Sequence, residues 1–165
     1  MHLLATFFAI ILLTTADAVP LREPKLHIAG DSQACSMRYA TESKGAVITC
    51  KGGTSTQQWH TKIDEAGIVP GDSVVIFLGS NDWYRKPDPK PILAKLKGTK
   101  CVWVGPPNMP KHKGPAADHL KKEVEADGTC AFLDSRDLNL KLPDGVHTSE
   151  PGRWLREAMK RLTSR

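Results

Sequence analysis

The apolar run Ser73-Val-Val-Ile-Phe-Leu78 is the feature that most constrains how this chain can fold. It is the most apolar segment after residue 18, and no polar side chain interrupts it beyond Ser73. A short, uninterrupted run of this kind is typical of a parallel strand that is buried on both faces. We therefore expect residues 73–78 to form the central strand of a parallel sheet.

Strands and helices are predicted to alternate on either side of this run. The sequence predicts strands over residues 25–29, 46–50, 73–78, 100–104 and 129–133, and helices over 33–43, 54–66, 92–97, 116–126 and 150–162. Such alternation predicts a single-domain, three-layer α/β/α sandwich. Because crossovers between parallel strands are right-handed and the connections are short, we expect a five-stranded, mostly parallel sheet of flavodoxin-like order 2-1-3-4-5.

The N-terminus has the pattern of a segment for export. Residues 3–13 are almost entirely apolar and are followed by Ala16-Asp17-Ala18, as in a secretory signal peptide that is cleaved after Ala18. The run is shorter than the ~20 residues of a membrane span, and an uncleaved anchor is the alternative. We expect residues 1–18 to be removed. Residues 19–165 then form a secreted or periplasmic domain with no stable membrane insertion.

Four cysteines in an exported chain predict two disulfides. Cys35 and Cys50 fall near the C-terminal edge of the expected sheet, whereas Cys101 and Cys130 begin their strands at the opposite edge. A five-residue strand separates the two edges by ~17 Å, but the Cα atoms of a disulfide lie within ~7 Å. The pairs Cys35–Cys50 and Cys101–Cys130 follow, with a free reactive cysteine as the alternative.

The charge of the chain excludes no fold but limits the partners. The formal net charge of +5 is spread along the sequence, with its densest points at Lys111-His112-Lys113 and Lys121-Lys122. Without a nucleic-acid-binding motif, this mild basicity favours anionic surroundings such as a cell envelope. No His, Cys and Asp cluster has the spacing of metal ligands. We expect a monomer without a metal, a cofactor or a nucleic-acid partner.

The tripeptide Gly30-Asp31-Ser32 stands where the first predicted strand ends and a helix begins. A strand–turn–helix of this kind exposes the serine hydroxyl beyond the sheet edge, close to the free N–H groups of the helix. Nucleophilic serines are often held in this way. The tripeptide recurs as Gly71-Asp72-Ser73, but there it precedes its strand. Ser73 is therefore expected at the opposite edge, in an ordinary turn.

The segment Asp144-Gly-Val-His147 can supply a base for the serine. Serine is a weak nucleophile until a neighbouring group accepts its proton, and an imidazole does so near neutral pH. A carboxylate three residues earlier can hold that imidazole in the required tautomer. An isolated Asp-x-x-His is more often a surface loop, but no other histidine of the chain has an acid placed in this way.

Two further segments, Gly52-Gly53 and Gly79-Ser-Asn81-Asp82, offer neutral hydrogen-bond donors. Attack on an ester places negative charge on the carbonyl oxygen, which fixed donors must stabilise. The backbone N–H groups of Ser32 and Gly53 and the side-chain amide of Asn81 are three such donors. Glycine also lets the backbone approach a substrate closely. Each segment taken alone is more often an ordinary turn.

Together the four segments resemble the SGNH (GDSL) hydrolase family. The matching motifs are Gly-Asp-Ser at 30–32, a glycine at 53, Gly-x-Asn-Asp at 79–82 and Asp-x-x-His at 144–147, in the order that the family has. The resemblance covers about residues 25–163.

This resemblance implies a role for each of the matching residues. Ser32 would be the nucleophile, His147 the base and Asp144 its partner, while Ser32, Gly53 and Asn81 would form the oxyanion hole. The second motif departs from the family pattern, because Lys51-Gly52-Gly53 stands in place of a fuller Asn- and Gly-containing block. Gly52 is therefore the alternative to Gly53.

Three residues of the expected rim, Trp83, Tyr84 and Met109, are candidates for substrate binding. They could stack on a sugar ring or hold a short acyl chain, or simply pack the loops. We expect a serine esterase that hydrolyses short acyl esters through an acyl-enzyme, acetyl esters on small-molecule or polysaccharide carbohydrate above all. The alternatives are a lysophospholipase or thioesterase, an O-acyltransferase and a non-catalytic SGNH-like binding module.

Overall fold

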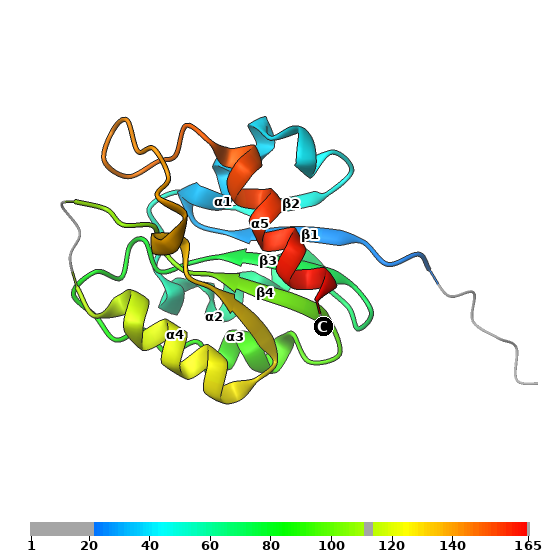
Figure 1. Cartoon of the computed structure of the whole chain (residues 1–165). Helices are drawn as coiled ribbons and strands as arrows, with labels where there is room; N and C mark the ends of the chain where they lie inside the picture. Colours follow the sequence, from blue (N-terminus) through cyan, green and yellow to red (C-terminus); the bar gives the residue numbers. More distant parts are fainter. Residues whose placement is uncertain (1–21, 111–113, 165) are drawn as a thin grey trace, which may run out of the picture.

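A sheet of parallel strands forms the centre of the molecule in the computed structural model, which describes residues 22–110 and 114–164. The predicted signal peptide, residues 1–18, therefore lies outside the described residues. The strands are β1 (Leu26–Gly30), β2 (Val47–Cys50), β3 (Ser73–Phe77), β4 (Lys100–Val104) and β5 (Cys130–Leu133). Their order is β2-β1-β3-β4-β5 and every neighbouring pair is parallel (Figure 1). The predicted strand order and the central position of β3 are confirmed.

Helices cover both faces of this sheet. The helices α1 (Ser32–Ser36) and α5 (Pro151–Thr163) pack on one face, and α2 (Trp59–Lys62), α3 (Lys90–Lys95) and α4 (Ala116–Asp127) pack on the other. Successive strand residues point to opposite faces. Val74 and Ile76 of β3 accordingly join one core, and Val75 and Phe77 join the other. Both faces of β3 are buried, which is the physical reason for its uninterrupted apolar run.

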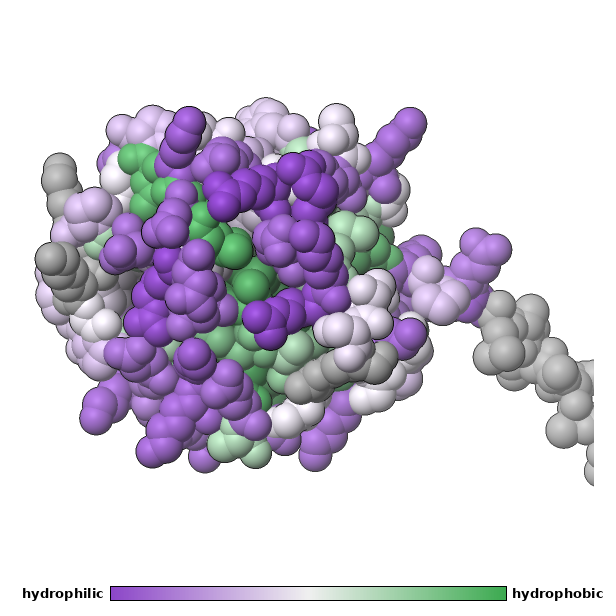
Figure 2. Space-filling model, in the orientation of Figure 1, coloured by the Kyte–Doolittle hydropathy of each residue, from purple (hydrophilic) through white to green (hydrophobic). Residues whose placement is uncertain are grey.

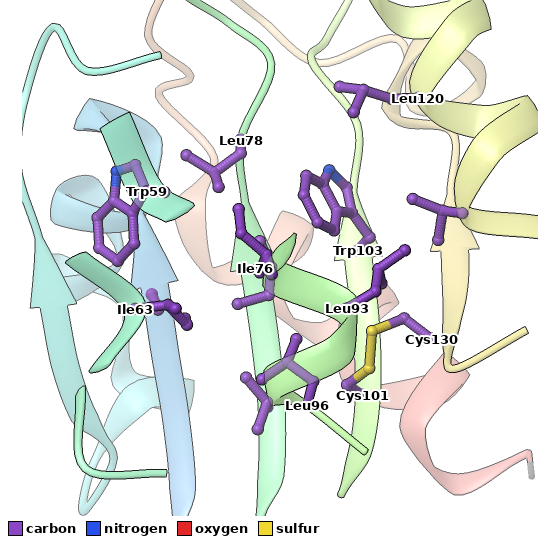
Figure 3. Packing of buried hydrophobic residues seen from close by; sticks show 14 of the residues in the cluster. Trp59, Ile63, Ile76, Leu78, Leu93, Leu96, Cys101, Trp103, Leu120 and Cys130 are labelled. Carbon is purple, nitrogen blue, oxygen red and sulfur yellow. A yellow bond between two sulfur atoms is a disulfide. The ribbon is translucent and has the colours of Figure 1, made fainter. Parts of the chain in front are cut away.

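The core under α2, α3 and α4 is built around two tryptophans. Trp59 and Trp103 are fully buried, and Figure 3 shows them among the aliphatic side chains of β3, α3 and α4. On the opposite face, the ring of Trp154 in α5 meets that of Phe77 edge-on, with centroids 5.0 Å apart. Aromatic pairs prefer this geometry. It fixes α5 against the centre of the sheet.

Both predicted disulfides are present. Cys35–Cys50 joins α1 to the end of β2 with a Cα–Cα distance of 5.3 Å. Cys101–Cys130 joins β4 to β5, where the two residues are paired in register, with a Cα–Cα distance of 4.7 Å. No cysteine is left free.

The helices that follow β1 and β2 are shorter than the sequence predicts. The expected helix over 33–43 is α1 followed by the 3₁₀ turns Met37–Tyr39 and Thr41–Ser43. The expected helix over 54–66 is α2 flanked by the 3₁₀ turns Thr56–Gln58 and Ile63–Ala66. In the first segment, the hydroxyls of Ser36 and Ser43 bond to backbone carbonyl oxygens at 3.0 and 2.8 Å. Such local bonds compete with a continuous helix.

The second Gly-Asp-Ser tripeptide has a structural role. The buried carboxylate of Asp72 accepts hydrogen bonds from the backbone N–H groups of Lys25 and Val69, at 2.9 and 3.1 Å, and from the guanidinium of Arg22. Burial favours the neutral acid, but these donors outweigh it and lower the pKa of Asp72 to about 2. Ser73 opens β3 at the N-terminal edge of the sheet, as predicted.

The surface is mainly hydrophilic on the face that carries α5, where hydrophobic residues show only in small gaps (Figure 2). Among the described residues, the most exposed large hydrophobic side chains are the two tyrosines, Tyr39 at 87% and Tyr84 at 81%. No helix within the described ranges is long and apolar enough to span a membrane.

Candidate active site

The register of the sheet brings the predicted site segments to one edge. Gly30 pairs with Cys50 on one side and with Phe77 on the other, so β1, β2 and β3 end together. Gly30 has a φ of 147°, and a Cβ built on it would lie 1.9 Å from the carbonyl oxygen of Phe77. Only glycine permits this close approach. The turn that carries Ser32 therefore begins directly against the end of β3.

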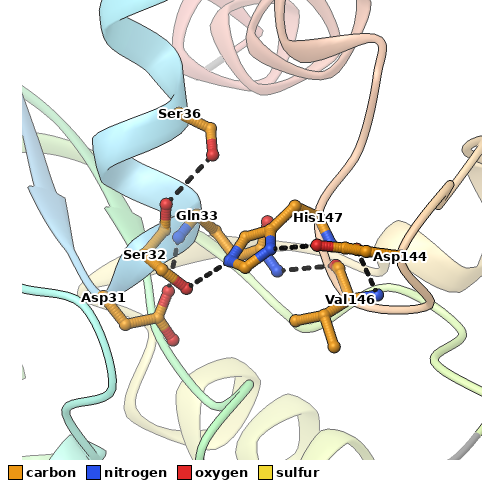
Figure 4. Close-up of polar contacts among 7 residues, drawn as sticks. All are labelled: Asp31, Ser32, Gln33, Ser36, Asp144, Val146 and His147. Carbon is orange, nitrogen blue, oxygen red and sulfur yellow. Dashed lines mark hydrogen bonds and ion pairs between the residues drawn. The ribbon is translucent and has the colours of Figure 1, made fainter.

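Ser32, His147 and Asp144 form a continuous chain of hydrogen bonds (Figure 4). Ser32 is the first residue of α1, and its Oγ lies 2.9 Å from Nε2 of His147. The other ring nitrogen, Nδ1, lies 2.7 Å from Oδ2 of Asp144. In this arrangement the imidazole can take the hydroxyl proton, and the carboxylate can stabilise the resulting cation.

Asp144 is held in place by its own loop. Its Oδ1 accepts hydrogen bonds from the backbone N–H groups of Val146 and His147, at 2.8 and 2.6 Å. The bond to the His147 side chain and these two backbone bonds lower the pKa of Asp144 well below its usual range. The group facing Nδ1 of His147 is therefore a carboxylate at any pH near neutral.

Gln33 joins the serine to the histidine loop, a contact that the sequence analysis missed. Its side chain is buried, and its Nε2 donates to the carbonyl oxygen of Val146 at 2.9 Å. The N-terminus of α1 is thus tied directly to the residue that precedes His147. In the sequence, only its position next to Ser32 could have indicated this contact of Gln33. Glutamine by itself gives no such signal, because it is mostly exposed in folded proteins.

Asp31 is fully buried at the N-cap of α1. It accepts a hydrogen bond from the Gln33 backbone N–H at 2.9 Å, and a longer one from the Asn81 side chain at 3.3 Å. Burial raises the pKa of Asp31 to about 7, and the nearby Asp82 carboxyl adds to the rise, although the backbone bond from Gln33 opposes it. Asp31 therefore changes its charge near neutral pH.

The side chain of Asn81 lies between two parts of the edge. Besides its bond to Asp31, its Nδ2 donates to the backbone carbonyl oxygen of Thr54 at 3.0 Å. The Thr54 hydroxyl donates to the Lys51 carbonyl oxygen at 2.6 Å and accepts from the indole of Trp59 at 2.9 Å. These bonds fix the turn after β2 and place the Asn81 amide beside it.

The two glycines of this turn have different neighbours, Ser32 for Gly52 and the cavity beside Asn81 for Gly53. A Cβ on Gly52 would lie 3.8 Å from the Cβ of Ser32. Gly53 has a φ of 70° and lines the same cavity as Asn81. Gly53 stays our prediction for an oxyanion donor, with Gly52 as the alternative.

The three predicted rim residues are divided between two cavities. Trp83 and Tyr84 line a cavity of about 540 Å³ that Gly53 and Asn81 also line. Met109 is buried and lines a smaller cavity of about 200 Å³, which it shares with Trp83. Trp83 therefore lines both cavities, whereas Met109 and Tyr84 line different ones.

The C-terminal edge of the sheet thus brings together a hydroxyl that could act as a nucleophile, an imidazole that could act as a base and neutral hydrogen-bond donors. In the part of the chain that the structure describes, no three His, Cys, Asp or Glu side chains are gathered as metal ligands.

Comparison with known proteins identifies the fold. No protein-family model and no curated protein matches the chain. Among solved structures, it is similar to the C-terminal catalytic domain of the peptidoglycan O-acetyltransferase OatA from Streptococcus pneumoniae, determined with a methylsulfonyl adduct. The TM-score is 0.65 at 19% identity, over 86% of this chain and 95% of the other.

Two further solved structures are similar. One is a Streptococcus pneumoniae protein provisionally described as a platelet activating factor, with a TM-score of 0.56 at 17% identity over 87% and 86% of the two chains. The other is a protein from Chitinophaga pinensis provisionally described as a lipase, with a TM-score of 0.52 at 16% identity over 77% and 79%. At these identities the likeness concerns the fold. It confirms the predicted α/β class.

Replacing Gln33 by methionine tests the link between α1 and the histidine loop. Methionine keeps the length of the side chain but cannot donate to Val146, so the His147 loop loses its direct tie to α1. We expect the kcat for p-nitrophenyl acetate to fall by about tenfold or more, because small displacements of reacting groups are costly. Thermal unfolding would verify that the variant is folded. An unchanged kcat in the folded variant would contradict this role.

Replacing Asp31 by asparagine tests the raised pKa. Between the unfolded value of 3.8 and the folded value of about 7, the folded protein binds more protons than the unfolded one. The free energy of unfolding of the wild type should therefore fall as the pH rises through this window. Asparagine keeps the N-cap oxygen but does not ionise. Urea unfolding at pH 4, 6 and 8 should show the variant gaining stability relative to the wild type as the pH rises. A difference that stays constant with pH would refute the assignment.

Proposed function

We propose that this chain is an exported serine esterase that cleaves short acyl esters, acetyl esters on carbohydrate above all. The observation that carries the proposal is the hydrogen-bonded chain of Ser32, His147 and Asp144 at the C-terminal edge of the sheet. Catalytic groups in open α/β sheets gather beyond the carboxyl ends of the strands. The fold that the chain shares with an acetyltransferase catalytic domain supports chemistry on an acyl group.

The first half of the proposed reaction forms an acyl-enzyme. The Oγ of Ser32 attacks the ester carbonyl carbon while Nε2 of His147 accepts the hydroxyl proton. The carbonyl oxygen becomes an oxyanion, which the N–H groups of Ser32 and Gly53 and the Asn81 amide stabilise. His147 then returns its proton to the departing alcohol as the ester bond breaks, and the acyl group stays on Ser32.

The second half repeats these steps with water. His147 takes a proton from the water that attacks the acyl-enzyme, and Ser32 leaves with that proton when the carboxylic acid is released. Asn81 must free one of its two amide hydrogens to serve the oxyanion. Its bond to Asp31, at 3.3 Å, is longer than its bond to Thr54, at 3.0 Å, and is the weaker of the two.

Export is supported by the cysteines and by the N-terminal segment. Disulfides persist in oxidising compartments outside the cytoplasm, and both cysteine pairs lie at disulfide distance. The pattern of residues 1–18 is that of a cleaved signal peptide. A secreted or periplasmic location agrees with an esterase that acts on envelope or environmental polysaccharide.

Acyl transfer to a sugar hydroxyl is the second candidate function. The same acyl-enzyme would form, but an alcohol would take the place of water in the second half of the reaction. The likeness to the catalytic domain of a peptidoglycan O-acetyltransferase favours this candidate.

The nucleophile is tested by comparing the two Gly-Asp-Ser serines. A fluorophosphonate probe should label the wild type and Ser73→Ala but not Ser32→Ala. Turnover of p-nitrophenyl acetate should fall by about 10³-fold or more only in Ser32→Ala, because the attacking oxygen is lost. Ser73→Ala is the matched control, since it removes the same side chain at the opposite edge of the sheet. Equal labelling of all three proteins would exclude Ser32 as the nucleophile, and a wild type with neither labelling nor turnover would favour the binding module.

Hydrolysis and transfer are separated by the fate of the acetyl group. With p-nitrophenyl acetate and an added oligosaccharide, hydrolysis predicts that one acetate is released for each nitrophenol. Transfer predicts less acetate, with the missing acetyl groups found on the oligosaccharide by mass spectrometry. We expect the release of acetate to equal that of nitrophenol. An acetylated oligosaccharide in place of that acetate would identify a transferase.

A further inference from the structure

The cavity beside Asn81 has a mainly polar lining. Its volume of about 540 Å³ lies within the range of roughly 300–1,000 Å³ that is usual for a ligand site. Gly53 and Asn81, two of the proposed oxyanion donors, line it together with Gln57, Tyr84 and Arg85. A group bound here would therefore lie next to two of the proposed oxyanion donors.

A second cavity continues the first. It has a volume of about 330 Å³ and shares Gln57, Asp82 and Arg85 with its neighbour. Beyond Arg85 it is lined by His60 and Lys86, among others. We call the two together the Arg85 trench. Since each part alone is large enough for a ligand, the trench has room for more than one sugar unit.

The side chains of the Arg85 trench suit hydroxyl groups. Gln57, Tyr84 and Arg85 are exposed, and within the described part of the chain their side chains have no hydrogen-bond or ion-pair partner. The Tyr84 ring packs against that of Trp83 with centroids 5.3 Å apart, which gives the entrance an aromatic surface. Amide and guanidinium groups donate in fixed planes, and an aromatic face covers the apolar side of a sugar ring.

The charges of the trench favour a neutral ligand. Arg85 and Lys86 bring positive charge, but the carboxylates of Asp82 and Asp88 line the same space. Asp82 is buried, and its Oδ2 accepts from the backbone and the hydroxyl of Thr56 at 2.9 and 2.7 Å. A lipid chain would need apolar walls, which this lining does not provide.

We infer that the Arg85 trench binds the alcohol part of the substrate, and that this part is a neutral oligosaccharide or polysaccharide of at least two sugar units. The inference rests on the proposed function, because it takes the glycan as the alcohol part of the ester that Ser32 attacks. The acetyl group faces Ser32, and the chain of sugars runs past Tyr84 towards Arg85 and Lys86. Binding therefore depends on the length of the glycan.

Binding of glycans that carry no ester tests the trench without turnover. Xylohexaose and N-acetylchitohexaose would be titrated into the mature protein by calorimetry, with hexagalacturonate as an anionic comparison. We expect at least one neutral hexasaccharide to bind, at least tenfold more tightly than its monosaccharide. Tyr84→Ala and Arg85→Ala should each weaken this binding by about tenfold.

The chain offers matched controls for both substitutions. Arg38 and Tyr39 are likewise exposed neighbours, but they lie at the 3₁₀ turn that packs against α5. Arg38→Ala and Tyr39→Ala should bind the hexasaccharide as the wild type does. With acetylated hexasaccharide as substrate, the ratio of its kcat/KM to that of p-nitrophenyl acetate should fall about tenfold in the trench variants and stay unchanged in the controls.

The outcomes separate this inference from the proposed function. Absence of binding to every neutral hexasaccharide, or equal losses in trench and control variants, would overturn the trench even if p-nitrophenyl acetate is hydrolysed. Tighter binding of hexagalacturonate would overturn the assignment to a neutral glycan. Binding that is lost in the trench variants would support the trench, and a lack of turnover in the same protein would then count against the esterase alone.

Discussion

The close pairing of β1 with β3 at Gly30 is the contact on which the site depends. The backbone N–H of Asp31 donates to the carbonyl oxygen of Phe77 at 3.0 Å, immediately after the last pair of the two strands. A slip of one residue would turn every side chain of β1 to the other face of the sheet. It would also separate Ser32 from the His147 loop. The buried faces of β3 oppose such a slip, so the packing of the core also fixes the geometry of the site.

Local patterns were sufficient to predict much of this arrangement. The apolar run of β3 predicted a strand that is buried on both faces, and the alternation of elements predicted the order of the sheet. The two cysteine pairs followed from the positions of the four cysteines relative to the ends of their strands. Ser32 and His147 were predicted to meet because of their motifs and the resemblance of those motifs to the SGNH family. The strand order and the cysteine pairs needed only the periodicity of a strand and the direction of the chain.

Contacts between side chains of distant segments could not be predicted in this way. Nothing in the sequence connects Gln33 with Val146, and the bond between them depends on where the loop before α5 passes. The Arg85 trench likewise arises from two segments, around Gln57 and around Arg85, that become neighbours only when β2 and β3 flank β1. The short helix after β1 was missed because the hydroxyls of Ser36 and Ser43 bond locally and compete with a continuous helix.

The two Gly-Asp-Ser tripeptides show how position alone decides the electrostatics of a buried carboxyl. Asp72 precedes its strand, where two backbone N–H groups and Arg22 lower its pKa to about 2. Asp31 follows its strand, where burial and the neighbouring Asp82 carboxyl raise its pKa to about 7. Ionised Asp72 therefore stabilises the N-terminal edge, whereas ionised Asp31 destabilises the edge that holds Ser32. Functional sites commonly cost stability in this way, because their groups are placed for chemistry and not for the lowest free energy. Asp31 keeps a buried acceptor beside Asn81 at that cost, and so holds the amide next to the space where the oxyanion would form.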